Sequence, residues 1–219
     1  MQQLKIKPAL LSVVACLLCA VPLAAQDFLD NFTVAVGGGF TFPVATIADH
    51  IKPGFNFIAS GGPRVHRRLS IVADFSLHYM NVDDDNFLQD PVNNVQISFG
   101  SLVRVWSLTA NPVFEFIKQE RFSSYATGGF GFYNRKLLLA APGVVPAVAC
   151  DTFWGICVDS SIPGGMVTGD LSLNKGGYNV GGGVTFGTNA KFFAEVRYHH
   201  MFTPGTATQL IPLSFGIRW

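Results

Sequence analysis

The chain has 219 residues, of which 49% are hydrophobic and only 13% are charged. Roughly a quarter of the residues of a soluble domain are charged, so this composition is unusual for a protein that meets water on all sides. The formal net charge of +1 excludes the strongly basic surface that nucleic-acid binding requires, and the length fits a single domain.

The first 25 residues have the composition of a secretory signal peptide. Its parts follow the order expected of such a peptide: two lysines, an apolar run at 9–21, and a cleavage zone of small residues that ends at Ala25. The run is shorter than the ~20 residues of a membrane-spanning helix, and Cys16 is followed by more apolar core rather than by the polar start of a lipoprotein. We therefore expect a signal peptide at 1–25 and an exported domain at 26–219, in preference to a membrane anchor or an acylated lipoprotein.

Beyond this segment, apolar residues alternate with small or polar residues. From 32 to 41 the even positions are mostly large and apolar, whereas the odd positions are Thr, Ala or Gly, and the stretches 69–80, 177–187 and 191–202 repeat the pattern. A period of two places the two sets on opposite faces of a strand, whereas a helix would scatter them. No later run approaches the ~18 consecutive apolar residues of a membrane helix. The expected strands are 30–41, 54–64, 69–80, 97–111, 122–134, 175–187, 191–202 and 207–219.

The face of these strands opposite the large apolar residues distinguishes between a soluble β-sandwich and a membrane barrel. In a soluble sandwich that face meets water and carries Lys, Arg, Asp and Glu, but here it is mostly Gly, Ala, Ser, Thr and Asn. Such residues fit the cramped lumen of a barrel of ~8 strands, and the apolar face then contacts lipid. The sequence therefore predicts an all-β fold, a single transmembrane antiparallel up-and-down β-barrel of about eight strands.

The connections tend to alternate between long and short. The long ones are expected at 42–53, 81–96 and 135–174, and the tight ones at 66–68 and 187–190. Short periplasmic turns and longer outer loops are typical of outer-membrane barrels. Residues 112–121 and 203–206 depart from this alternation, the first by its length and the second by its shortness. Asn111 and Pro112 are expected either to end the fourth strand or to form a bulge.

The last strand ends on an aromatic residue. Its apolar face consists of Ile211, Leu213, Phe215, Ile217 and Trp219. With this ending the chain resembles the small outer-membrane β-barrel proteins of the OmpA/OmpX type, and the resemblance extends to 30–41, 176–187 and 194–198. It implies an integral protein of the bacterial outer membrane, exported through the periplasm, whose closing strand is recognised by the outer-membrane assembly machinery. The chain shows no counterpart of the peptidoglycan-binding domain of OmpA, so tethering to the cell wall is not implied.

Three charged residues are expected inside the barrel. The alternation places Asp74 of the third strand and Glu195 and Arg197 of the seventh on the inward face. A lone buried charge costs several kcal/mol, so we expect them to form a salt-bridge network that plugs the lumen. The functional alternative is a gate or an ion path. On either interpretation, Arg197→Leu is expected to raise conductance or to weaken the barrel.

We expect neither a catalytic, nor a cofactor, nor a metal site. His199 and His200 are adjacent on a strand and point to opposite faces, which does not suit a shared ligand. Ser76 and His78 have the spacing of a catalytic pair, but no acidic residue is evident to orient the histidine. The acidic run 83–85 lacks the spacing of a calcium loop, and the glycine clusters lie inside strands with no helix after them, unlike phosphate-binding loops.

Cys150 and Cys157 are the cysteines outside the signal segment. In an oxidising compartment, an even pair this close predicts a disulfide that closes a loop, and the segment offers too few ligands for a metal. Both lie in the longest expected loop, 135–174. Its apolar residues suggest contact with lipopolysaccharide, a partner protein or a surface, or a cap over the barrel.

These observations predict a non-enzymatic, monomeric protein of the outer membrane with a structural or surface-interaction role. The expected partners are outer-membrane lipid, lipopolysaccharide and the assembly machinery. Three alternatives remain open at this point: a narrow gated channel of the same fold, a soluble secreted β-barrel or sandwich that binds a ligand, and a barrel enzyme acting on lipid A.

Overall fold

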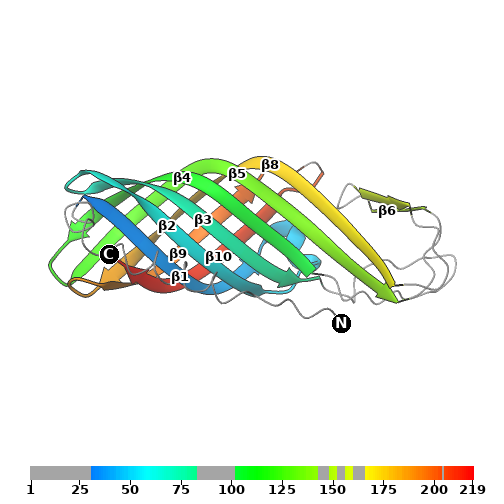
Figure 1. Ribbon diagram of the computed structural model, residues 1–219, viewed down its shortest axis with the longest axis horizontal. Coiled ribbons are helices and arrows are strands. Elements are labelled where there is room, and N and C mark those ends of the chain that lie inside the picture. The colour runs from blue at the N-terminus through cyan, green and yellow to red at the C-terminus, as the bar shows by residue number, and fades with distance from the viewer. Residues whose placement is uncertain (1–30, 83–101, 143–147, 152–155, 160–165, 204) are drawn as a thin grey trace, which may run out of the picture. The chain divides into compact units, whose positions relative to one another are not determined.

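Eight long strands form one closed sheet in the computed structural model of the chain (Figure 1). The structure describes residues 31–82, 102–142, 148–151, 156–159, 166–203 and 205–219, with the backbone alone between 138 and 171. The barrel strands are β1 (Phe32–Pro43), β2 (Gly54–His66), β3 (Leu69–Asn81), β4 (Leu102–Lys118), β5 (Phe122–Pro142), β8 (Met166–Phe186), β9 (Lys191–Met201) and β10 (Thr208–Arg218). Their order around the barrel is β1-β10-β9-β8-β5-β4-β3-β2. The antiparallel up-and-down barrel predicted from the alternation is confirmed.

Three short elements belong to the connections. The 3-10 helix η1 (Ala45–Asp49) lies between β1 and β2, inside a segment expected to be a loop. Strands β6 (Val148–Asp151) and β7 (Ile156–Asp159) pair with each other in a two-stranded sheet of their own. In the described part of the chain, no helix combines the length and the apolar character that crossing a membrane requires.

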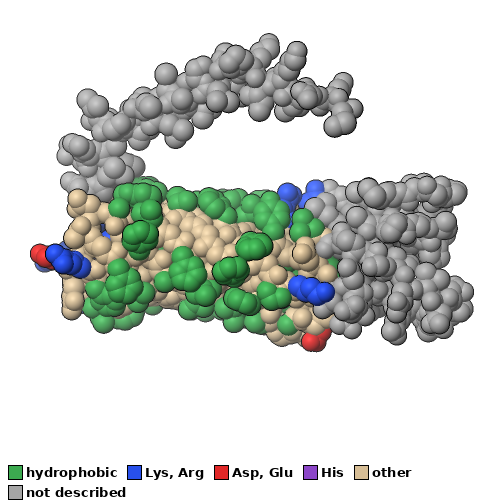
Figure 2. All heavy atoms as spheres, turned by 90° about the horizontal axis from the view of Figure 1, so that it is seen from below, with side chains coloured by type: hydrophobic (Ala, Val, Ile, Leu, Met, Phe, Trp, Pro, Cys, Tyr) green, Lys and Arg blue, Asp and Glu red, His purple; other side chains and the backbone are tan. Residues whose placement is uncertain are grey.

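The barrel wall has an apolar outside and a largely polar inside, as the alternation predicts. On β9, for example, the outward Phe192 and Val196 are 67% and 49% exposed, whereas the inward Glu195 is 3% exposed. On the face seen in Figure 2, hydrophobic side chains are spread along the barrel, and Lys and Arg side chains lie near its two ends. A soluble β-sandwich would bury the large aromatic residues, so this distribution contradicts that alternative.

The fourth strand is longer than expected. It continues through Pro112 to Lys118, so the segment 112–121 is mostly strand and the connection to β5 is a short turn. Proline is tolerated here because Asn111 and Pro112 keep their partners on β3 but have no ladder partners on β5. The register shift of this pair falls further along, between Glu115 and Ile117.

The longest expected loop, 135–174, is also largely strand. β5 pairs with β8 continuously from Phe122–Phe186 to Pro142–Met166. Among the described residues, β4 pairs with β5 as far as Leu138 and β9 pairs with β8 as far as Gly177. Beyond those points the described residues form no closed wall, so inward and outward faces no longer impose the alternation that identified the other strands.

Candidate functional site

The three predicted charged residues lie together inside the barrel. Alternation along β3 directs Asp74 inward, and alternation along β9 does the same for Glu195 and Arg197. All three are buried. Because β3 and β9 are not neighbours in the sheet, Arg197 reaches Asp74 across the lumen rather than along the wall.

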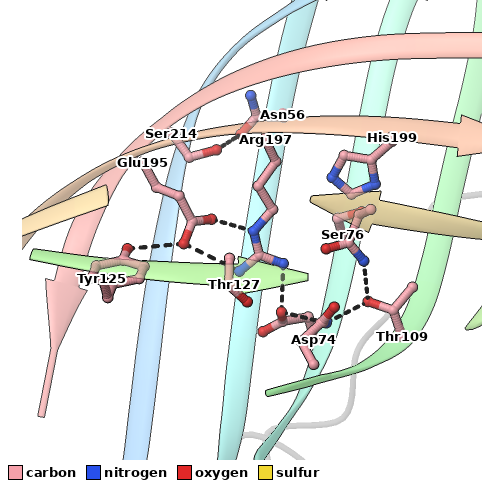
Figure 3. Close-up of polar contacts among 12 residues, drawn as sticks. Asn56, Asp74, Ser76, Thr109, Tyr125, Thr127, Glu195, Arg197, His199 and Ser214 are labelled. Atoms are coloured by element: carbon pink, nitrogen blue, oxygen red, sulfur yellow. Dashed lines mark hydrogen bonds and ion pairs between the residues drawn. The ribbon is translucent and has the colours of Figure 1, made fainter. Parts of the chain in front are cut away.

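Arg197 joins the two carboxylates (Figure 3). Its Nη1 lies 2.5 Å from Oδ2 of Asp74, and its Nε lies 2.6 Å from Oε1 of Glu195. Its Nη2 also donates to Oε2 of Glu195 at 3.2 Å. The guanidinium group therefore uses its planar fork to compensate two buried charges from different sides of the barrel, which a lysine ammonium could not match.

Three further residues complete this group of contacts. Tyr125 on β5 donates its hydroxyl to Oε2 of Glu195 at 2.8 Å. The Nη2 of Arg218 lies 4.0 Å from the same oxygen, and its guanidinium carbon lies 4.2 Å from the centroid of the Tyr125 ring. On the other side, Nδ2 of Asn111 donates to Oδ2 of Asp74 at 2.6 Å. We call these residues the ion-pair cluster: Asp74, Asn111, Tyr125, Glu195, Arg197 and Arg218.

Our interpretation of the sequence missed half of the ion-pair cluster. Asn111, Tyr125 and Arg218 lie at inward positions of β4, β5 and β10, so extending the alternation to every strand would have found them. With Arg218 included, two carboxylates face two guanidinium groups, and the formal charge of the cluster is zero. A neutral, hydrogen-bonded arrangement is what a buried group of charges requires if it is not to destabilise the fold.

Two buried histidines form a second polar contact. The rings of His78 and His199 meet edge to face with their centroids 5.5 Å apart. The Nε2 of His78 lies 3.0 Å from Oγ of Ser76, and its Nδ1 lies 2.8 Å from Oγ1 of Thr41. The Nδ1 of His199 lies 3.1 Å from the hydroxyl of Tyr133. The Ser76–His78 pair has catalytic spacing, but a threonine hydroxyl occupies the position where a triad has its carboxylate.

The loop end of the lumen is closed by apolar side chains, which the sequence analysis did not predict. Inward residues of several strands pack there against two residues of the β1–β2 connection, Ile47 of η1 and Ile51, each 1% exposed. We call this group the apolar plug; its members are Ile47, Ile51, Met80, Val82, Val103, Val105, Tyr133, Leu137, Met201 and Leu210. Packed apolar side chains offer no hydrogen-bonding partners to water at this level of the lumen.

Inward glycines of β8 make room for the large side chains of the lumen. A Cβ atom on Gly177, Gly181 or Gly183 would lie closer to a neighbouring side chain than real contacts allow, so each of these positions requires glycine. The separations would be 2.9 Å from Gly177 to Cδ2 of Tyr133, 2.6 Å from Gly181 to Cγ of Arg197, and 2.6 Å from Gly183 to the hydroxyl of Tyr125. Two of the three glycines of the 181–183 cluster, Gly181 and Gly183, therefore pack against side chains of the lumen.

The predicted assembly signal lies on the outer face of the barrel. The set Ile211, Leu213, Phe215, Ile217 and Trp219 follows the outward positions of β10 and the residue after it. Cys150 and Cys157 are direct partners in the β6–β7 ladder, but their side chains lie outside the described residues and the disulfide stays a prediction. Residues 83–85 also lie outside the described part. Among the described side chains, no group of three or more His, Cys, Asp or Glu is placed to hold a metal ion.

Comparison with known proteins supports the fold. No protein-family model matches the sequence, and no curated protein matches it. Among solved structures, Neisserial surface protein A is similar with a TM-score of 0.53 and 16% identity, over 85% of this chain and 95% of that one. A major outer membrane protein from Thermus thermophilus is similar with a TM-score of 0.54 and 10% identity, over 86% of this chain and 98% of that one. At these identities the likeness shows the fold, a small outer-membrane type of β-barrel.

Proposed function

We propose that the chain is an integral protein of the bacterial outer membrane, closed to ions and without enzymatic activity, that serves envelope integrity or surface contact through its loops. The observation that carries this proposal is the barrel itself, whose outer face is apolar and whose interior is filled with buried side chains. An apolar exterior of this extent, if it faced water, would cause aggregation, whereas in a bilayer it is the expected surface.

The height of the apolar exterior fits a bilayer. On β4 every outward residue from Phe116 to Trp106 is apolar. At ~3.4 Å per residue this stretch is about 34 Å long, and at a tilt of ~40° it covers about 26 Å along the barrel axis. Outer-membrane barrels have an apolar band of about 25 Å. With short turns at one end, the longer connections at the other are then the extracellular loops.

The closed lumen supports a structural role over a channel. The ion-pair cluster and the apolar plug occupy two successive levels of the lumen, the first with paired charges and the second with packed apolar side chains that disfavour water. An enzymatic role has less support, because the Ser76–His78 pair is buried, with 4% and 2% of each residue exposed, and faces the interior rather than lipid. A lipid substrate would meet the outward face, where His200 contacts Tyr198 and aromatic rings.

Two measurements on the purified protein test the proposal. A membrane barrel resists unfolding by detergent at room temperature, so we expect the unheated protein to migrate differently from the boiled protein in gels. In planar bilayers we expect no discrete conductance steps. A protein that stays soluble without detergent would disprove the membrane location, and regular single-channel openings would instead establish the channel alternative.

The closing strand supports the proposed route of assembly. The outward set from Ile211 to Trp219 leaves the lumen contacts of β10 untouched, so it is free to act as a recognition signal. We expect Trp219→Ala, which keeps the two backbone hydrogen bonds between residue 219 and Val34, to reduce the amount of barrel that reaches the membrane in cells while detergent-refolded protein keeps its heat-sensitive mobility. Equal loss in both settings would indicate a folding defect and not a recognition defect.

A further inference from the structure

Basic residues predominate at the turn end of the barrel, in and beside the turns that connect β2 to β3, β4 to β5 and β8 to β9. The structure describes six basic residues there and two acidic ones, Glu115 and Glu120. The basic residues are Arg64, Arg67, Arg68, Lys118, Arg121 and Lys191. Asp27 and Asp30 precede β1 and lie outside the described part, and the basic residues would remain in excess even if both belonged to this end. The turn end therefore has an excess of positive charge.

Hydrogen bonds join the three turns into one surface. The ammonium group of Lys118 donates to the carbonyl oxygen of Arg67 at 2.7 Å, which holds the β2–β3 turn beside the end of β4. The backbone amide of Gly187 donates to the carbonyl oxygen of Arg121 at 2.9 Å, which holds the β8–β9 turn beside the start of β5. The basic residues of the three turns are therefore neighbours in space.

Three arginines of this surface have unused hydrogen-bonding capacity. Arg67, Arg68 and Arg121 are exposed, and their guanidinium groups have no acceptor among the described residues. Lys118 differs from them, because its ammonium group lies 2.7 Å from Oε2 of Glu115. We call Arg67, Arg68 and Arg121 the basic turn patch. Their five-donor side chains are the ones at this end that are open to an anion.

Outward phenylalanines lie next to these basic residues. Phe122 follows Arg121 in the chain, and its ring packs 5.1 Å from that of Phe186 between centroids. Phe116, near the end of β4, and Phe192, near the start of β9, are 51% and 67% exposed. Aromatic residues form girdles at both interfaces of outer-membrane barrels, so the basic turn patch lies at the level of the lipid headgroups of the leaflet at the turn end.

We propose that the basic turn patch binds the phosphate group of anionic phospholipids in the leaflet at the turn end. The proposal rests on the outer-membrane location proposed above. The fork of a guanidinium group binds two phosphate oxygens, and the acyl chains attached to that phosphate contact the neighbouring phenylalanines. A free anion or an acidic protein in water would use the charges and not the phenylalanines. The ammonium group of a zwitterionic phospholipid is repelled by the excess of positive charge, so the patch selects the anionic lipid.

The test measures competition between two phospholipids with the same acyl chains. The refolded full chain in detergent is titrated with an equal mixture of phosphatidylglycerol and phosphatidylethanolamine, and bound lipid is counted by native mass spectrometry. We expect the unaltered protein to retain several times more phosphatidylglycerol than phosphatidylethanolamine. The double variant Arg67→Gln/Arg121→Gln should bind phosphatidylglycerol at least about tenfold more weakly, since each basic residue at an anionic headgroup contributes roughly a fivefold effect.

A matched double variant removes two charges from the opposite end of the barrel. Arg104→Gln/Lys175→Gln changes the net charge by the same amount and should retain phosphatidylglycerol as the unaltered protein does. Arg67→Lys/Arg121→Lys keeps the charges but loses the forks, so its affinity should lie between those of the unaltered protein and of the glutamine variant. Excess inorganic phosphate or poly-glutamate should not displace the lipid, because neither contacts the phenylalanines.

Equal retention of the two lipids by the unaltered protein, or unchanged retention by Arg67→Gln/Arg121→Gln, would disprove the lipid site. An equal loss in Arg104→Gln/Lys175→Gln would show attraction by net charge alone. Displacement by phosphate would assign the patch to free anions, and displacement by poly-glutamate would assign it to an acidic protein. Absence of the heat-sensitive gel shift in the unaltered protein would disprove the proposed membrane barrel itself, whichever lipid is bound. Should the double variant fail to refold, Arg121→Gln compared with Arg104→Gln gives the same decision.

Discussion

The ion-pair cluster and the apolar plug close the same lumen by opposite means. The cluster takes its residues from the barrel wall alone, and its contacts are directional and cross the lumen from β3 to β9. The plug is held by packing, and two of its members, Ile47 and Ile51, come from a connection rather than from the wall. The comparison indicates that the middle of the barrel opens only when the whole barrel unfolds, whereas the loop end can open locally.

The largest effect is expected from breaking the cluster at its centre. Arg197→Leu leaves the carboxylates of Asp74 and Glu195 buried without their main cation and should lower the free energy of unfolding by about 3–5 kcal/mol. Urea titration of the protein in lipid vesicles, followed by the heat-sensitive gel shift, measures this change. Arg218→Leu is the matched control, because Arg218 stands 4.0 Å from Glu195, and its effect should be clearly smaller. Equal losses of stability in the two variants would show that Arg197 is not the main cation of the cluster.

A smaller and more local effect is expected from loosening the plug. Ile47→Ala removes a buried side chain from η1 and should destabilise the closed connection by about 2 kcal/mol. Cleavage of the 44–53 segment by a broad-specificity protease should then accelerate by about 30-fold while global unfolding changes little. Val65→Ala, at a residue that is 52% exposed, is the control and should change neither rate. A drop in global stability as large as that of Arg197→Leu would contradict the local role of the plug.

The glycines of β8 sharpen the comparison by testing how tightly the middle of the lumen is packed. Gly181→Ala forces a methyl group against Arg197 and the backbone of β9, and should cost about 1–3 kcal/mol of stability. Gly176→Ala is a control on the same strand, since a Cβ atom there would find its nearest neighbour 3.9 Å away. Urea titrations that gave the same midpoint for both variants would show that the middle can rearrange.

The smallest effect on barrel stability is expected from changes in the β6–β7 pair, which belongs neither to the ion-pair cluster nor to the apolar plug. The register makes Cys150 and Cys157 direct partners, the arrangement from which a cross-strand disulfide forms. We expect no maleimide labelling of the native protein without a reductant, and labelling of the Cys150→Ser variant without one. Barrel unfolding should change by less than about 0.5 kcal/mol. Free labelling of the native protein would disprove the disulfide.

The wall of the barrel is the part of the fold that could be predicted from the sequence. A closed wall imposes an inside and an outside on every residue, so the alternation identified the strands and placed Asp74, Glu195 and Arg197 in one lumen. It could not place Ile47 and Ile51, because a connection has no period that reveals which of its residues turn inward. Pro112 was misjudged for a related reason, since a proline interrupts only one of the two ladders of its strand and the sequence does not say which.

The inner glycines of β8 also have a consequence for engineering. Gly177, Gly181 and Gly183 carry no side chains, so Tyr133, Arg197 and Tyr125 of other strands pack directly against the backbone of β8 at these positions. The one inward side chain among them is the uncharged amide of Asn179. Replacing Tyr125 and Tyr133 by smaller residues would therefore open space beside β8 that is bordered by peptide groups and an amide. Because Arg197 would still pair with both carboxylates, a pore made in this way should discriminate little between anions and cations.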